Sequence, residues 1–148
     1  MAIRRATNPS GAEAVYGAPA YVRNHRGKPL AEQAWIGLDE SLAHLASARW
    51  MAAEIPERQV VHRVNSLWAA QAAARAGLGL AVLPCFSADV DRGLRRVGAP
   101  RPEWAASLWL LTHPDLRKVA RIRPVLDFLA GRLASKRPLL EGDSARRG

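Results

Sequence analysis

The residues of this chain whose types and spacing best suit ligand binding lie at the start of a helical stretch. Asn65 and Ser66 stand directly before a run of good helix formers that begins at Leu67, so either side chain can cap the free amides of the first turn. Free amides at a helix start also attract the anionic group of a ligand. The pattern predicts an anion-binding site at these three residues, and simple capping is the alternative.

The single cysteine is the only candidate for nucleophilic catalysis. Cys85 follows a predicted strand, and an imidazole from His62 or His113 beside it would make a thiol-imidazole pair. Cysteine is also common as a small buried apolar residue, which is the alternative interpretation. The four histidines lack metal-ligand spacing, and the glycines at 77 and 79 precede a strand, whereas those of a phosphate loop precede a helix. We therefore expect no catalytic residue, no metal and no cofactor, with a Cys-dependent hydrolase as a lesser alternative.

The elements that position Asn65 and Ser66 have the order strand, helix, strand. The valine-rich stretch 60–64 predicts a strand, and the alanine-rich stretch after it predicts a helix that ends at Gly77. The apolar run 80–83 predicts a strand that is covered on both faces. This order predicts a right-handed crossover in a parallel sheet. Sheets of this kind bind ligands at the edge formed by the carboxyl ends of their strands, where Asn65 and Ser66 would lie.

The rest of the chain predicts further short elements. Leu42 to Ile55 fits either one amphipathic helix or a loop followed by a shorter helix around Trp50. Apolar residues from 122 to 133 recur at helical spacing, with Pro124 acceptable only in the first turn. The other predicted elements are strands at 1–5, 13–17, 34–37, 94–97 and 107–112, and helical turns after 18 and at 30–33 and 85–91.

Composition restricts the class of protein and its location. The chain has 148 residues, 49% of them apolar, which is enough for a core of modest size. The formal charge of +9 is spread along the chain without a basic stripe, so it predicts only weak attraction to polyanions. One cysteine excludes an internal disulfide, and we find neither a signal peptide nor a membrane-spanning stretch. These features predict a cytoplasmic protein without a membrane partner.

Motifs along most of the chain, from about Ala2 to Leu133, resemble the C-terminal effector-binding domain of LysR-type transcriptional regulators. That family has an asparagine-serine helix start, an alanine-rich helix and a Gly-Leu-Gly-Ile-Ala-x-Leu-Pro run. The matching segments here are VYGAPAY at 15–21, GKP at 27–29, AWIGLD at 34–39, the helix start at 65–66, GLGLAVLP at 77–84 and LWLLTHPDLRKVARIRPVLDFL at 108–129. Their shared order and spacing make the resemblance specific.

The resemblance implies an α/β fold of the periplasmic-binding-protein type, with a parallel-type sheet, flanking helices, one nearly complete subdomain and part of a second. It implies that Gly37, Leu38 and Asp39 face the cleft between subdomains and touch the effector, whereas a solvated loop carboxylate is the alternative for Asp39. The implied division is a remnant of the first subdomain at 1–12, the second effector-binding subdomain at 13–105, a return into the first at 106–135, and a disordered tail at 136–148.

The implied function is effector sensing. A small molecule, often carboxylate-bearing in such families, would bind between the subdomains of a homodimer, and DNA would be bound only through an N-terminal winged helix-turn-helix that these residues lack. The alternatives are a truncated non-functional remnant and a solute-binding protein of the same fold.

Overall fold

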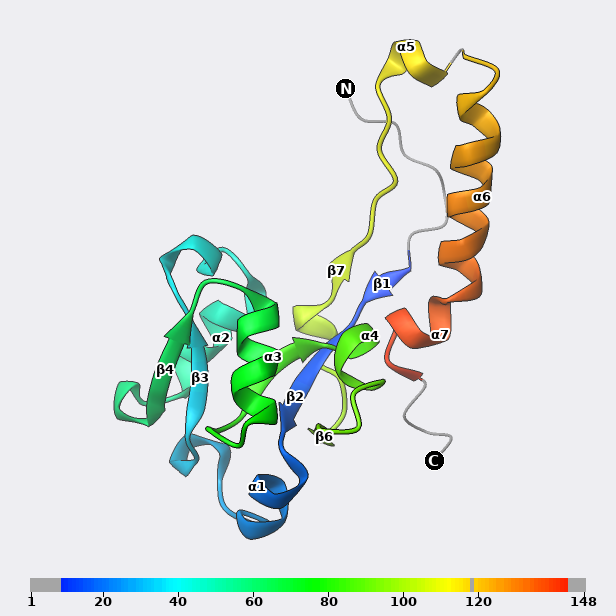
Figure 1. Cartoon of the computed structure of the whole chain (residues 1–148). Coiled ribbons are helices and arrows are strands. Elements are labelled where there is room, and N and C mark those ends of the chain that lie inside the picture. The colour runs from blue at the N-terminus through cyan, green and yellow to red at the C-terminus, as the bar shows by residue number, and fades with distance from the viewer. Residues whose placement is uncertain (1–8, 118, 144–148) are drawn as a thin grey trace.

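Residues 9–117 and 119–143 are described by the structure, a computed structural model, and form a mixed α/β fold (Figure 1). The strands are β1 (Ser10–Gly11), β2 (Glu13–Gly17), β3 (Trp35–Leu38), β4 (Val60–Val64), β5 (Ala81–Pro84), β6 (Arg95–Val97) and β7 (Ala106–Ser107). The helices are α1 (Pro19–Asn24), α2 (Ala46–Glu54), α3 (Leu67–Arg75), α4 (Cys85–Ala88), α5 (Pro114–Arg117), α6 (Ile122–Ser135) and α7 (Arg137–Leu140). Short 3-10 turns lie at Leu30–Glu32, Glu40–Leu42, Glu57–Gln59 and Pro102–Trp104.

The strands β4, β3, β5, β2 and β6 lie side by side in that order. β3 and β4 pair in parallel, and Leu80, just before β5, continues the parallel arrangement through a bridge to Trp35. β2 runs antiparallel to both β5 and β6. The predicted strand-helix-strand unit is therefore β4, α3 and β5, with β3 between its two strands, and the sheet is parallel in this part and mixed as a whole.

The glycine at 79 allows β5 to approach β3. A Cβ at this position would lie 2.5 Å from the Ala34 carbonyl oxygen, which is closer than real contacts allow. The same carbonyl accepts a 2.8 Å hydrogen bond from the Leu80 amide. The glycine of the GLGLAVLP motif is thus required by close backbone packing.

Two apolar clusters cover the two faces of the sheet. On one face α3 and α4 pack against β2, β3 and β5, with Ala70 and Ala74 of α3 at 1% and 0% exposure. On the other face Trp35, Met51 and Trp104 form the centre of a cluster that includes residues of α2. The segment 42–55 follows the second of its two predicted forms, because a 3-10 turn precedes the shorter helix α2.

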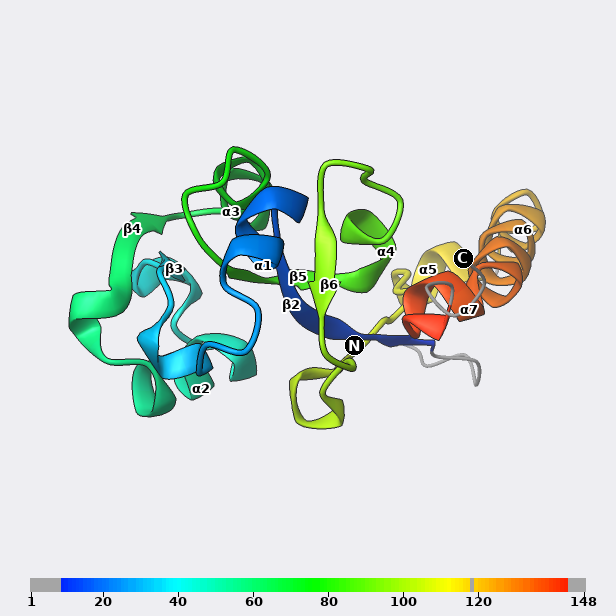
Figure 2. The same cartoon turned by 90° about the horizontal axis from the view of Figure 1, so that it is seen from below.

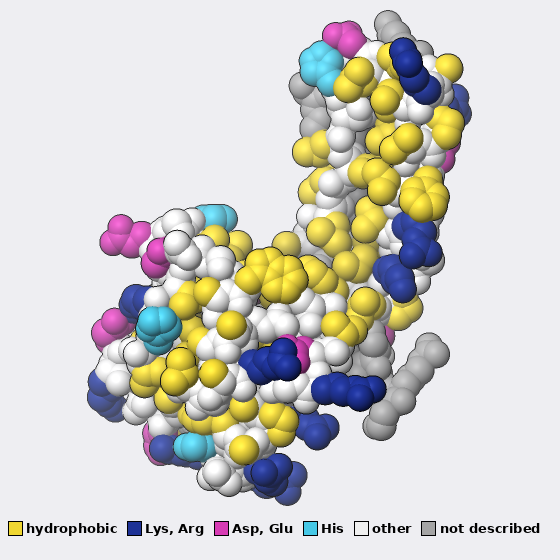
Figure 3. Space-filling model, viewed as in Figure 1, with side chains coloured by type: hydrophobic (Ala, Val, Ile, Leu, Met, Phe, Trp, Pro, Cys, Tyr) yellow, Lys and Arg dark blue, Asp and Glu magenta, His cyan; other side chains and the backbone are white. Residues whose placement is uncertain are grey.

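The segment from β7 to α6 forms an arm that projects from the sheet (Figures 1 and 2). The prediction of a buried strand over 107–112 is wrong, because β7 ends at Ser107 and no described strand pairs with the apolar residues after it. Trp109 and Leu111 are 47% and 58% exposed. The helix predicted over 122–133 is present as α6 with Pro124 in its first turn, but none of its residues is buried. Figure 3 shows apolar side chains along the arm.

The chain returns from the arm to the sheet at α7. Leu140 is 8% exposed, and its carbonyl accepts a 2.9 Å hydrogen bond from the Ala12 amide. Arg96 donates a 3.0 Å hydrogen bond to the Gly142 carbonyl and pairs with the carboxylate of Asp89, and these two side chains are 14% and 4% exposed. The disorder expected from residue 136 onward therefore does not hold for the part of the tail that is described.

The remaining predicted strands at 13–17, 34–37 and 94–97 correspond to β2, β3 and β6 within a residue or so. The strand predicted at 1–5 lies outside the described residues. None of the helices in the described ranges is both long and apolar enough to cross a bilayer.

Candidate functional site

The two predicted groups of effector-binding residues lie at the same edge of the sheet. In the parallel pair, Leu38 of β3 stands opposite Val64 of β4, so the chain leaves both strands at their carboxyl ends. The Asp39 amide donates a 2.9 Å hydrogen bond to the Val64 carbonyl. Residues 37–39 and 65–67, which are far apart in sequence, are therefore neighbours in space.

Ser66 caps α3. Its Oγ accepts a 3.1 Å hydrogen bond from the Ala69 amide, and Leu67 is the first residue of the helix. The serine side chain is half-buried, whereas Asn65 is exposed. The hydroxyl uses one lone pair as a cap, so its proton remains able to donate to an acceptor beyond the helix end. Capping and anion binding are thus compatible at this residue.

Asp39 occupies the matching position after β3. Its Oδ1 accepts hydrogen bonds from the Ser41 amide at 3.0 Å and from the Ser41 hydroxyl at 2.5 Å, which caps the 3-10 turn at Glu40–Leu42. The carboxylate keeps further acceptor capacity, since each carboxylate oxygen has two lone pairs. The edge therefore offers a hydroxyl donor at Ser66 and a carboxylate acceptor at Asp39.

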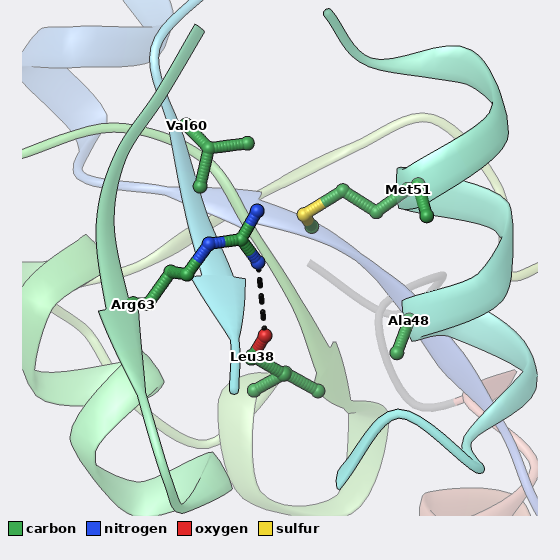
Figure 4. A pocket seen from close by; sticks show the side chains of 6 residues that line it. Leu38, Ala48, Met51, Val60 and Arg63 are labelled. Atoms are coloured by element: carbon green, nitrogen blue, oxygen red, sulfur yellow. Dashed lines mark hydrogen bonds between the residues drawn. The ribbon is translucent and has the colours of Figure 1, made fainter. Parts of the chain in front are cut away.

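A pocket of about 40 Å³ lies next to this edge, between α2 and the strands β3 and β4 (Figure 4). A small cavity of this kind has room for little more than one or two non-hydrogen atoms or waters, not for a whole metabolite. Its lining residues are Leu38, Ala48, Met51, Ala52, Val60 and Arg63.

The Arg63 side chain borders this pocket and is hydrogen-bonded to two neighbouring segments. Its guanidinium donates a 3.1 Å hydrogen bond to the Leu38 carbonyl and bonds of 2.8 and 2.7 Å to both carboxylate oxygens of Glu57. Gly37 makes room for it, because a Cβ there would lie 3.2 Å from Arg63 Nη1 and 2.7 Å from Val60 Cγ1. Sequence reasoning missed Arg63 and Glu57; the one signal was an arginine in a valine-rich strand just before Asn65.

The catalytic alternative at Cys85 finds little support. The thiol is 0% exposed, and burial raises its pKa, so the protonated form that is a poor nucleophile is favoured. The groups that act on it include Tyr16, Arg96 and Asp89, whereas His62 and His113 are both exposed. Within residues 9–117 and 119–143, no three side chains of metal-binding type gather at one place.

Comparison with known proteins places this geometry in a family. The family model of the LysR substrate binding domain matches residues 15–134. The regulatory domain of CrgA, a LysR-type transcriptional regulator from Neisseria meningitidis, aligns with a TM-score of 0.64 at 22% identity, over 87% of this chain and 68% of that one. No curated protein is similar enough in sequence to count as a match.

Two further solved structures show the same fold. The regulatory domain of AphB in Vibrio vulnificus has a TM-score of 0.55 at 18% identity, over 88% of this chain and 69% of that one. The effector binding domain of QuiR, solved in complex with shikimate, has a TM-score of 0.57 at 12% identity, over 92% of this chain and 66% of that one. The fold is therefore that of LysR substrate-binding domains, which is of the periplasmic-binding-protein type, and the chain belongs to the LysR substrate-binding domain family.

Proposed function

We propose that this chain senses a small effector at the carboxyl edge of β3 and β4, through Gly37, Leu38, Asp39, Asn65, Ser66 and Leu67. The observation that carries the proposal is the 2.9 Å hydrogen bond from the Asp39 amide to the Val64 carbonyl, because it holds two separately predicted segments together. Sites at the carboxyl ends of parallel strands are the usual ligand sites of open α/β sheets.

The chemistry of this edge favours an effector that carries a carboxylate and a hydrogen-bond donor. The amides of Leu67 and Trp68 at the start of α3 and the hydroxyl proton of Ser66 suit an anionic group, whereas the Ala69 amide is used by the cap. Asp39 suits a hydroxyl or amine of the same molecule, because its carboxylate can only accept hydrogen bonds when ionised. QuiR, which has the same fold, was solved with bound shikimate, and this supports a small-molecule effector here.

The wider role follows the family. In this proposal, residues 13–105 form the second effector-binding subdomain, and residues 106–135 return into a first subdomain to which 1–12 also belong. The domain acts as a homodimer in the cytoplasm, performs no catalysis, and affects transcription through a winged helix-turn-helix that binds DNA. The match to the LysR substrate-binding family over residues 15–134 supports the regulatory role.

The test is a thermal-shift screen of small carboxylic acids, each paired with its neutral amide, followed by calorimetry on the acids that raise Tm. We expect acids but not amides to bind. Ser66→Ala should weaken the best acid about tenfold, because one charge-assisted hydrogen bond is lost. Asp39→Asn should weaken only those acids that also carry a donor group.

The matched control is Ser135→Ala in α6, where the hydroxyl donates a 2.8 Å hydrogen bond to the Arg132 carbonyl of the same helix. This variant should bind the acids as the parent does. Affinity that changes less than about twofold in Ser66→Ala would mean that Ser66 only caps the helix.

A further inference from the structure

The pocket between α2 and the sheet exists because small side chains of α2 face the strands. Ala48 and Ala52 lie one turn apart on α2 and present only methyl groups to it, opposite Leu38 and Val60 of the strands. Met51, which is 6% exposed, also lines it. The wall formed by α2 is therefore apolar, whereas the wall formed by the strands also carries the polar groups of Arg63 and Leu38. The space suits a group about the size of a methyl or ethyl.

One cation borders this apolar space. Figure 4 shows the Arg63 guanidinium lying across the pocket, between Val60, Met51 and the Leu38 carbonyl that it contacts. The 3.1 Å hydrogen bond to Leu38 fixes the orientation of the guanidinium. An arginine beside an apolar space suits a molecule with a short alkyl group and a carboxylate, since the planar guanidinium binds carboxylates through two parallel hydrogen bonds.

The present partner of Arg63 is exchangeable. Glu57 is 79% exposed in its side chain and Arg63 48% exposed, so water competes strongly for both. A ligand carboxylate that replaces Glu57 would keep the guanidinium paired and would add the burial of its alkyl group. Without such a ligand, Glu57 is the ion-pair partner of Arg63.

We propose that Arg63 and the pocket formed by Leu38, Ala48, Met51, Ala52 and Val60 bind a short aliphatic carboxylate, with the carboxylate on Arg63 in place of Glu57 and the alkyl end inside. This subsite lies on the α2 side of the sheet and does not depend on Ser66. We expect it to prefer short unbranched acids, because the pocket of about 40 Å³ is small.

The experiment is a titration of the full chain with sodium propionate, followed by the methyl resonance of Met51 in protein labelled with ¹³C-methyl methionine. The chain has two methionines, Met1 and Met51, so the Met51 signal is the one that disappears in Met51→Leu. We expect a saturable shift in the millimolar range for propionate. Propionamide, which lacks the charge, and 2,2-dimethylpropionate, which is too wide, should shift the signal at least about tenfold less at equal concentration.

Four variants separate the contribution of the charge from that of the apolar space. Arg63→Gln should weaken propionate binding about tenfold, and Arg63→Lys should weaken it less. Glu57→Gln should strengthen propionate binding about twofold to fivefold, because it removes the competing carboxylate. Ala48→Leu should abolish binding by filling the pocket. The matched controls are Arg58→Gln, an exposed arginine that does not line the pocket, and Ala53→Leu, an exposed alanine of α2; both should bind as the parent does.

Each result has a definite consequence. Equal shifts with propionate and propionamide, or unchanged affinity in Arg63→Gln or Glu57→Gln variants that melt cooperatively, would overturn the subsite. Unchanged affinity in Ala48→Leu would do the same. Ser66→Ala should leave the propionate titration unchanged, so loss of the effector site at α3 and loss of this subsite are distinguishable.

Discussion

The helices α3 and α6 carry apolar residues at similar helical spacing, yet they differ in what they contact. In α3, Ala70 and Ala74 are 1% and 0% exposed because the sheet lies against them. In α6 no residue is buried, and Val125 and Phe128 are 54% and 65% exposed. Amphipathic spacing specifies which face of a helix seeks burial, whereas burial itself requires a neighbouring element.

This contrast divides the described residues into a packed sheet and an arm. The sheet with α1 to α4 and α7 holds the buried side chains and the candidate site. The arm, from the end of β7 to α6, exposes Trp109, Leu111 and Phe128. We therefore expect substitutions in the sheet to change stability strongly and equivalent substitutions on exposed surfaces to change it little.

The largest effect should follow from Arg96→Gln. Removing this cation leaves the 4% exposed carboxylate of Asp89 buried without its charge partner, which should cost about 3–5 kcal/mol in the free energy of unfolding. The measurement is urea denaturation. Arg137→Gln, which removes the partner of Glu141 from an ion pair in which Arg137 is 61% exposed, should cost below about 1 kcal/mol. Equal costs would contradict the role of burial.

Leu83→Ala in β5 should cost about 2–5 kcal/mol, because Leu83 is fully buried between the sheet and α3 and the substitution leaves a cavity. Leu129→Ala in α6 removes the same atoms from a side chain that is 40% exposed and should cost about 1 kcal/mol or less. Urea midpoints of both variants measure the difference. If Leu129→Ala lost as much stability as Leu83→Ala, the apolar face of α6 would be buried in solution.

The smallest effect should be a gain in helix stability from a substitution at Gly131 of α6. A Cβ there would meet nothing within 4 Å, so Gly131→Ala should stabilise the helix by up to about 1 kcal/mol through helix propensity alone. Slower amide exchange within α6 measures the gain. The same substitution at Gly79 has the opposite sign, because its Cβ would meet the Ala34 carbonyl. An unchanged exchange rate in Gly131→Ala would mean that another process limits the opening of α6.

Local patterns account for the parts of the fold and site that the sequence predicted. Ser66 caps α3 because an N-cap depends on the adjacent residues alone. The short strands β2 and β3 likewise follow from apolar runs next to turn residues. The pairing of residues 37–39 with the start of α3 came from the family resemblance, since the register between β3 and β4 is not visible in either segment alone.

Contacts between distant segments account for the parts of the fold and site that the sequence did not predict. The apolar run at 108–111 has the composition of a buried strand, but burial depends on layers that no described residues supply on both sides of it. The link between Arg63 and Leu38 joins residues that are 25 apart in the chain, and it requires a glycine at 37 in the neighbouring strand. The arginine in a valine-rich strand is a local signal, but its partner across the sheet is not visible from the strand alone.

The hydrogen bond between the Asp39 amide and the Val64 carbonyl has a mechanical consequence. Because it ties the exits of two strands, we expect the loop after β3 and the first turn of α3 to open together rather than separately. Amide exchange at Asp39 should then slow or quicken together with exchange at the start of α3.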